Sequence, residues 1–187
     1  RVTSAGVFEE PIVVLPTVED VLRRTKAAGI PERNAMATRM DDYVGAVLGQ
    51  LDAFGLRENT MVIFTSDHGS RGKNSVFEGG AKVPMMVVWP EHIQAGVEND
   101  SLIGNIDIAS TLIEVAGGNA PPDMVQDGRS FMSQLLGQPE PMDWRTSMLI
   151  EAGNSRAIVT RDWKYVANRV PPEIEAKMKA RPGEVFW

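Results

Sequence analysis

The amino-acid sequence predicts an α/β fold that ends in a smaller antiparallel sheet. Three observations predict this class. A long amphipathic helix pattern covers residues 31–54, and two apolar runs rich in β-forming residues cover 60–65 and 83–89. From Met142 onward the pattern changes to short strand-like segments with a turn between the last two, at residues 147–152, 156–160 and 164–167.

Composition and charge exclude some functions. The chain has 187 residues, of which 43% are hydrophobic, so it can build a substantial core. A net charge of -6 argues against binding to nucleic acid, although a site can be locally positive on an acidic protein. Cysteine is absent, which excludes disulfides and thiolate chemistry within this chain. No apolar run approaches the length of a membrane span, and nothing in the sequence defines the oligomeric state.

The first elements lie between proline and glycine residues. A short strand is expected at residues 12–15, and a helix at 17–28 with Thr17 as its N-cap and Gly29 at its end. The stronger helix, at 31–54, carries apolar side chains at steps of three and four residues: Met36, Met40, Tyr43, Val44, Val47, Leu48, Leu51 and Phe54.

The two apolar runs are expected to be buried strands. The first, at 60–65, leads directly into Asp67 and His68, which are two types of metal ligand. In open α/β sheets ligands bind outside the carboxyl ends of the strands, so we expect both side chains to share one concave site. The second strand, at 83–89, ends at Pro90.

The second half of the chain is predicted to contain helices before and after the three strands. Asp107 is a candidate cap for a helix that runs to Ala116. Short helices are also expected at 131–136 and 172–180, on either side of the three strands.

Candidate functional residues gather after the first buried strand. Asp67 supplies a hard oxygen ligand, and His68 is either a second ligand or a donor to a ligand. Lys73 can meet an anion near the metal, or it can be a solvated loop residue. Arg71 is open to the same two interpretations. The run Glu78-Gly79-Gly80 is expected to shape the loop.

Six motifs follow one another along the chain. Five surround the candidate site or lie after it: the strand and Asp67-His68-Gly69, the run from Glu78 to Pro84, the helix from Asp107, Asp127-Gly128-Arg129-Ser130, and the hairpin Arg161-Asp162-Trp163-Lys164-Tyr165. The sixth is the preceding helix, with Met40-Asp41-Asp42-Tyr43-Val44-Gly45. Together these motifs resemble the sulfatase family of the alkaline-phosphatase superfamily, and the likeness covers residues 35–167 in the family's order.

Other family features are absent. The sequence has no Cys or Ser followed by x-Pro-x-Arg, the motif whose first residue becomes formylglycine in this family, and no N-terminal Asp-Asp metal pair. The chain therefore resembles an internal piece of a sulfatase that holds half of the metal site. We expect residues 1–187 alone to be inactive.

The resemblance implies an alkaline-phosphatase-like sandwich, present in part, at 1–140, and part of a C-terminal α+β subdomain at 141–187. It implies hydrolysis of a small-molecule or saccharide sulfate ester by a formylglycine nucleophile outside this chain. One divalent metal is expected on Asp67 and His68, Ca²⁺ first and Mn²⁺ as the alternative. Lys73 would be catalytic and would bind substrate with Arg71. A periplasmic or secreted location is also typical of the family.

Two other functions remain open at this point. One is a phosphonate or phosphate-ester hydrolase of the same superfamily that uses one metal. His68 and His92 are the only histidines in this sequence, whereas relatives that bind two metals need several. The histidine content therefore favours a site for one metal. The other is a non-catalytic module with the sulfatase fold, which the missing nucleophile favours.

Overall fold

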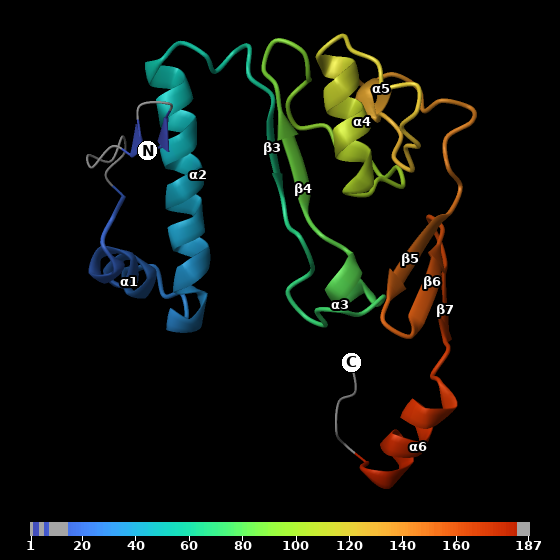
Figure 1. Ribbon diagram of the computed structural model, residues 1–187. Coiled ribbons are helices and arrows are strands. Elements are labelled where there is room, and N and C mark those ends of the chain that lie inside the picture. The colour runs from blue at the N-terminus through green and yellow to red at the C-terminus, as the bar shows by residue number, and fades with distance from the viewer. Residues whose placement is uncertain (1, 4–5, 8–14, 183–187) are drawn as a thin grey trace. The chain divides into compact units, whose positions relative to one another are not determined.

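The computed structural model describes residues 2–3, 6–7 and 15–182, which belong to two compact units (Figure 1). One unit comprises Arg1–Thr60 with Trp89–Glu91, and the other comprises Met61–Val88 with His92–Trp187. Residues 12–14 of the expected first strand lie outside the described residues, and Leu15 is in no strand. The predicted division near residue 140 stays a prediction.

The first unit contains a short hairpin and two helices. The hairpin pairs β1 (Val2–Thr3) with β2 (Gly6–Val7), an element that was not predicted from the sequence. Helix α1 (Val18–Ala27) confirms the predicted helix, with the Thr17 hydroxyl accepting a hydrogen bond from the Asp20 N–H at 3.2 Å. Helix α2 (Ala35–Ala53) begins later than expected, because the 3₁₀ turn η1 (Glu32–Asn34) precedes it.

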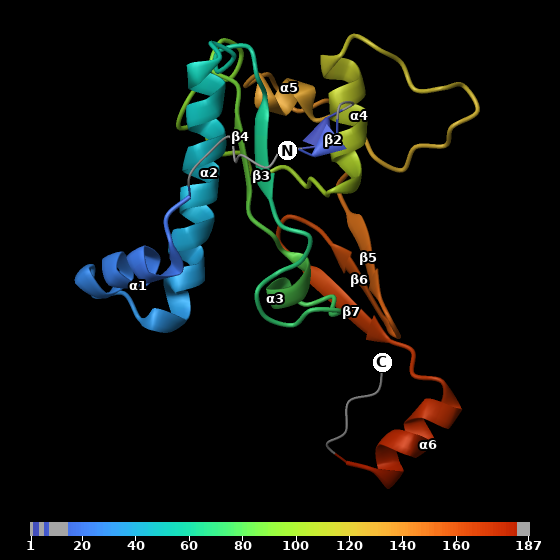
Figure 2. The same ribbon diagram turned by 60° about the vertical axis from the view of Figure 1, so that its left-hand side comes forward.

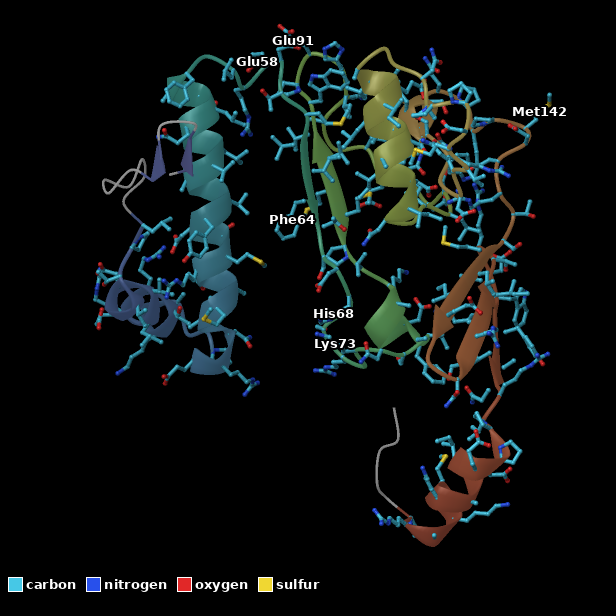
Figure 3. The ribbon with its side chains drawn as sticks, viewed as in Figure 1. Glu58, Phe64, His68, Lys73, Glu91 and Met142 are labelled. Atoms are coloured by element: carbon cyan, nitrogen blue, oxygen red, sulfur yellow. The ribbon has the colours of Figure 1, made fainter. Side chains whose placement is uncertain are left out.

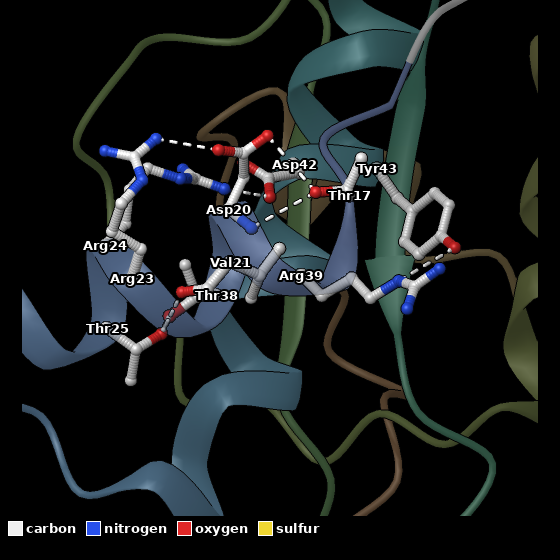
Figure 4. Close-up of polar contacts among 10 residues, drawn as sticks. All are labelled: Thr17, Asp20, Val21, Arg23, Arg24, Thr25, Thr38, Arg39, Asp42 and Tyr43. Carbon is white, nitrogen blue, oxygen red and sulfur yellow. Dashed lines mark hydrogen bonds and ion pairs between the residues drawn. The ribbon is translucent and has the colours of Figure 1, made fainter.

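Polar contacts join α1 to α2 (Figure 4). Arg24 donates a hydrogen bond to the Asp42 carboxylate at 2.5 Å, and only 15% of the Asp42 side chain is exposed. The buried Thr25 hydroxyl donates to the Val21 carbonyl oxygen at 2.7 Å and lies 3.5 Å from the Thr38 hydroxyl. The two helices are therefore tied together at more than one turn.

The second unit begins with an antiparallel hairpin. Strands β3 (Val62–Thr65) and β4 (Met85–Val88) pair from Val62 opposite Val88 to Thr65 opposite Met85. The expectation of two buried strands is wrong here: β3 is half-buried throughout, and β4 alternates between half-buried and exposed residues. In the described part of the chain each of these strands has one partner, which leaves its other edge uncovered.

Helices α4 (Ile106–Val115) and α5 (Met132–Leu135) contact each other on one side of this hairpin (Figures 1 and 2). Asp107 lies within the first turn of α4, so its prediction as the N-cap is wrong by two positions. Its carboxylate is fully buried and accepts two hydrogen bonds from the Arg145 guanidinium. Backbone N–H groups of Gly104 and Arg129 donate to the same carboxylate, each at 2.8 Å. This cluster joins α4 to the chain leading into the C-terminal sheet.

The C-terminal sheet confirms the three predicted strands. Its order is β5 (Met148–Ala152), β6 (Ser155–Val159), β7 (Lys164–Asn168), with antiparallel pairing throughout. Helix α6 (Pro172–Ala180) follows as predicted. The short helix α3 (Glu78–Ala81) lies beside this sheet in both views (Figures 1 and 2). Within the described residues, no helix is both long enough and apolar enough to cross a membrane.

Candidate functional site

The candidate site lies on the loop that joins β3 to α3 and β4. This loop begins at Ser66, directly after the last residue of β3, so the strand delivers Asp67 and His68 at its carboxyl end as predicted. Figure 3 shows His68 and Lys73 on this loop, beyond the end of β3. The Ser66 hydroxyl donates to the His68 carbonyl oxygen at 2.7 Å, which fixes the start of the loop.

The side chains of Asp67 and His68 face each other. One Asp67 oxygen, Oδ1, accepts the His68 backbone N–H at 3.0 Å, and the other, Oδ2, lies 3.7 Å from His68 Nε2. His68 Nδ1 is 2.8 Å from the carbonyl oxygen of Gly69. Because a carbonyl oxygen can only accept, Nδ1 carries the proton of the neutral ring, and the lone pair of Nε2 remains free.

This pair of atoms fits a shared metal ion. Ligands that each lie about 2.1 to 2.4 Å from one ion are about 3.0 to 4.0 Å apart at ordinary coordination angles. The separation of Asp67 Oδ2 and His68 Nε2 lies in that range. Asp67 is 84% exposed and His68 37%, so an ion can reach both. Among the described residues, no three His, Cys, Asp or Glu side chains form a cluster that could hold a metal.

Glycine residues hold the loop closed. The N–H of Gly69 donates to the Gly80 carbonyl at 2.8 Å, and the N–H of Arg71 donates to the Gly79 carbonyl at 2.9 Å. A Cβ atom on Gly80 would lie 2.0 Å from the Gly72 carbonyl oxygen, and one on Gly79 would lie 2.3 Å from that of Arg71. The expectation that Gly79 and Gly80 shape the loop is therefore confirmed.

Replacing Gly80 by alanine is expected to open this loop. The added methyl group would meet the backbone of Gly72, which cannot move without breaking the loop's hydrogen bonds. We expect a loss of about 1–3 kcal/mol in the free energy of unfolding, measured by urea denaturation. Gly45→Ala in α2 is the control, because nothing lies within 4 Å of its Cβ position; there a change near zero or a gain is expected. Equal stability of Gly80→Ala and wild type would show that the loop adapts.

Lys73 and Arg71 extend from the same loop into solvent. Both residues are exposed, and among the described residues neither side chain makes a hydrogen bond or an ion pair. Asn74, the residue after Lys73, has a φ of 62°, a left-handed conformation that asparagine tolerates. The structure therefore leaves both cations available to an anion and places neither against Asp67 or His68.

Asp67 also lines a broad, open depression of about 1980 Å³. Asn74, Glu78 and Lys164 contribute to the same depression, whereas His68 and Lys73 do not line it. A ligand approaching Asp67 can thus touch both the loop and strand β7.

Sequence reasoning missed one partner of the loop, Lys164 of β7. Its ammonium donates to the Val76 carbonyl at 3.1 Å and forms an ion pair with Glu78. The hydrogen bond from Lys164 lowers the pKa of the Glu78 carboxyl, against a smaller opposing effect of burial. Lys164 does stand in the hairpin motif at 161–165, but its partner lies 86 residues away, a pairing that no local pattern reveals.

Comparison with known proteins supports the family resemblance of the six sequence motifs. The profile of the Sulfatase family matches residues 15–118, which include the candidate site. Steryl-sulfatase of Rattus norvegicus is 39% identical over 118 residues, covering 52% of this chain and 20% of the relative. An ulvan-active sulfatase of Formosa agariphila is 37% identical over 75% of this chain and 30% of its own length. An N-acetylgalactosamine-6-O-sulfatase of Bacteroides thetaiotaomicron is 26% identical over 94% of this chain and 40% of its own length.

Solved structures show the same fold. The structure of BT4656 in complex with its substrate D-glucosamine-2-N,6-O-disulfate superposes with a TM-score of 0.66 at 26% identity, over 71% of this chain and 30% of that one. A sulfatase structure from Bacteroides thetaiotaomicron superposes with a TM-score of 0.60 at 22% identity, over 98% of this chain and 49% of that one. The fold is thus alkaline-phosphatase-like, as expected, and the chain spans about a fifth to two fifths of the length of the curated relatives described above. The chain belongs to the sulfatase family.

Proposed function

We propose that the full-length protein hydrolyses sulfate esters and that its substrates are sulfated saccharides. The observation that carries this proposal is the match of the Sulfatase profile across the whole candidate loop, with Asp67, His68 and Lys73 in the family's order. The saccharide class is supported by BT4656, whose substrate is a glucosamine disulfate, and by the relative named for N-acetylgalactosamine sulfate. A periplasmic or secreted location is part of the same proposal.

Asp67 and His68 would hold one divalent cation, with Ca²⁺ as the first choice and Mn²⁺ as the alternative. The donor set supports this, because a carboxylate oxygen and a free imidazole nitrogen face each other 3.7 Å apart. When bound, such a cation polarises the oxygens of an anionic substrate. Ca²⁺ prefers oxygen ligands, whereas an imidazole suits Mn²⁺ better, so His68 is the residue that discriminates between the two ions.

Lys73 would act on the leaving group. Cleavage of the ester bond leaves negative charge on the bridging oxygen, and an ammonium placed there stabilises that charge as it develops. Arg71 would bind substrate, since its guanidinium carries no ion pair within the described residues and can bind an oxyanion with two donors. The nucleophile, a formylglycine outside residues 1–187, belongs to this proposal by family resemblance alone.

The direct test is to measure ester hydrolysis by the purified full-length protein, as release of sulfate from the sulfate esters and of the alcohol product from the phosphorus esters. Sulfated glucosamine and galactosamine monosaccharides, an aryl sulfate, a phosphate diester and a phosphonate ester are compared at equal concentration. We expect kcat/KM to be highest for a sulfated sugar. Preferential cleavage of the phosphonate or the phosphate diester would assign the protein to the other hydrolase class. A protein that cleaves none of them but binds the sugars would be a non-catalytic module.

The metal assignment predicts different results for two variants. Asp67→Ala removes a carboxylate ligand and should lower metal affinity at least about tenfold, together with activity. His68→Asn replaces nitrogen by oxygen, so it should keep or improve binding if Ca²⁺ is native and weaken binding if Mn²⁺ is native. Calorimetric titration of the metal-free variants with each ion measures this without reference to turnover.

The control for these variants is Asp123→Ala, which removes an exposed carboxylate that does not line the depression containing Asp67. It should bind metal like the wild type. Full metal affinity in Asp67→Ala would remove Asp67 from the site and leave the metal proposal without its principal ligand.

A further inference from the structure

A lysine of the C-terminal sheet holds the candidate loop from outside. Lys164 begins strand β7, and its ammonium reaches two groups of the loop, the Val76 carbonyl oxygen at 3.1 Å and the Glu78 carboxylate. These partners are 88 and 86 residues away in the sequence. The contact therefore couples two parts of the second unit that are otherwise distant along the chain.

Burial distinguishes the hydrogen bond from Lys164 to Val76 from the ion pair with Glu78, whose side chain is 61% exposed. Val76 is fully buried, and only 16% of the Lys164 side chain is exposed. Lys82 also lies near Glu78, but at 4.0 Å and with 79% of its side chain exposed. An exposed pair of this kind contributes little, whereas loss of Lys164 would leave a buried carbonyl without its donor.

The contact lies close enough to Lys73 in the loop to restrain the position of the Lys73 backbone. Residues 69–80 form a loop closed at its base by the two hydrogen bonds between Gly69 and Gly80 and between Arg71 and Gly79. Val76 follows Lys73 by three residues, and the Ser75 N–H donates to the Gly72 carbonyl across Lys73 itself at 3.0 Å. A loop closed at its base and held at Val76 leaves Lys73 little freedom of backbone position.

We propose that Lys164 is a positioning residue for Lys73, holding the loop through the Val76 carbonyl and the Glu78 carboxylate so that the Lys73 ammonium meets the leaving oxygen. This inference rests on the proposed sulfate-ester hydrolysis for its catalytic consequence. Its structural part, the restraint of the loop by β7, is independent of that reaction.

The kinetic test is a double-mutant cycle in the full-length protein. Lys164→Met should lower kcat by roughly tenfold to a hundredfold with a smaller change in KM, because a misplaced charge acts mainly in the transition state. Lys164→Arg should recover part of this loss. In a Lys73→Ala background, Lys164→Met should cost almost nothing further. A full additional loss in that background would show that Lys164 acts independently of Lys73 and would overturn the proposal.

Hydrogen exchange tests the restraint without any substrate. The N–H groups of Gly69 and Arg71 should exchange at least about tenfold faster in Lys164→Met, while those of α4 keep their rates. Lys82→Met is the matched control, since it removes the other lysine near Glu78, and it should leave both measurements unchanged. Unchanged exchange at Gly69 and Arg71 in Lys164→Met would refute the restraint. A wild-type protein without sulfate release would instead overturn the proposed function, and the exchange rates would still decide whether Lys164 holds the loop.

Discussion

Lys73→Ala in the full-length protein is expected to lower kcat/KM for the proposed sulfate-ester substrate by about a hundredfold or more, which corresponds to about 3 kcal/mol of transition-state stabilisation. The physical reason is the loss of a positive charge beside the oxygen that becomes negative as the ester bond breaks. The loss should be larger for sugar sulfates than for aryl sulfates, because a phenolate leaves with less need for charge stabilisation. Steady-state kinetics on both substrate types measure it.

The same substitution should leave the fold intact. Lys73 is exposed and makes no ion pair within the described residues, so the melting temperature should stay within a few degrees of the wild-type value. Lys177→Ala, which removes an exposed lysine of α6, is the control for the change in net charge and should keep full activity. Near-normal turnover of Lys73→Ala would show that Lys73 is a solvated loop residue without a catalytic role.

Arg145→Met is expected to destabilise the protein by about 3–5 kcal/mol. It leaves the Asp107 carboxylate, which has no exposed surface, without the guanidinium that donates two hydrogen bonds to it. The change also removes the stacking of Arg145 over the Trp144 ring, at 5.0 Å. Urea denaturation measures the effect.

Two further variants separate the buried charge from other causes. Arg156→Met breaks an exposed pair with Glu151, both about half exposed, and should cost less than about 1 kcal/mol. Adding Asp107→Asn to Arg145→Met should restore part of the stability, because the amide keeps an acceptor for Gly104 and carries no charge. If Arg145→Met cost no more than Arg156→Met, the buried pair would be of no special importance to the fold.

The pH dependence of stability gives an independent measurement of the same pair. Burial alone raises the pKa of Asp107, but hydrogen bonds from Arg145 and from the N–H groups of Gly104 and Arg129 outweigh it, so the pKa lies below 3.8. The carboxylate therefore stabilises the fold above about pH 4, and this contribution is lost as the pH falls through the depressed pKa of the folded state. Asp107→Asn should lack that part of the acid dependence.

Local sequence signals predicted helices α1 and α6 and the three C-terminal strands well. Thr17 and Gly29 bound α1, and the helix predicted at 172–180 matches α6. The three C-terminal strands were also predicted, within one or two residues at each end. These elements depend on caps, turns and periodicity, which operate over a few residues and are legible in a single sequence.

Pairing and long-range contacts could not be predicted in the same way. An apolar run such as 60–65 is typical of a buried strand, yet β3 is half-buried because a run's composition does not reveal how many neighbours cover it. The ion pairs of Asp107 with Arg145 and of Glu78 with Lys164 span 38 and 86 residues. For the candidate site, the sequence placed Asp67 and His68 after a strand, but the free lone pair of His68 Nε2 follows only from the carbonyl of Gly69.

The separation of Lys164 from its loop has a consequence for the order of events during synthesis. Strands β3 and β4 and the glycine-rich loop between them are complete once residue 88 has been added, whereas the donor to Val76 is added at residue 164. At about 5 to 20 residues per second, the intervening residues take roughly 4 to 15 seconds. During that interval the Val76 carbonyl of the nascent chain lacks its hydrogen-bond donor, the Lys164 ammonium. We therefore expect the loop to be most accessible to proteases and chaperones before β7 has been synthesised.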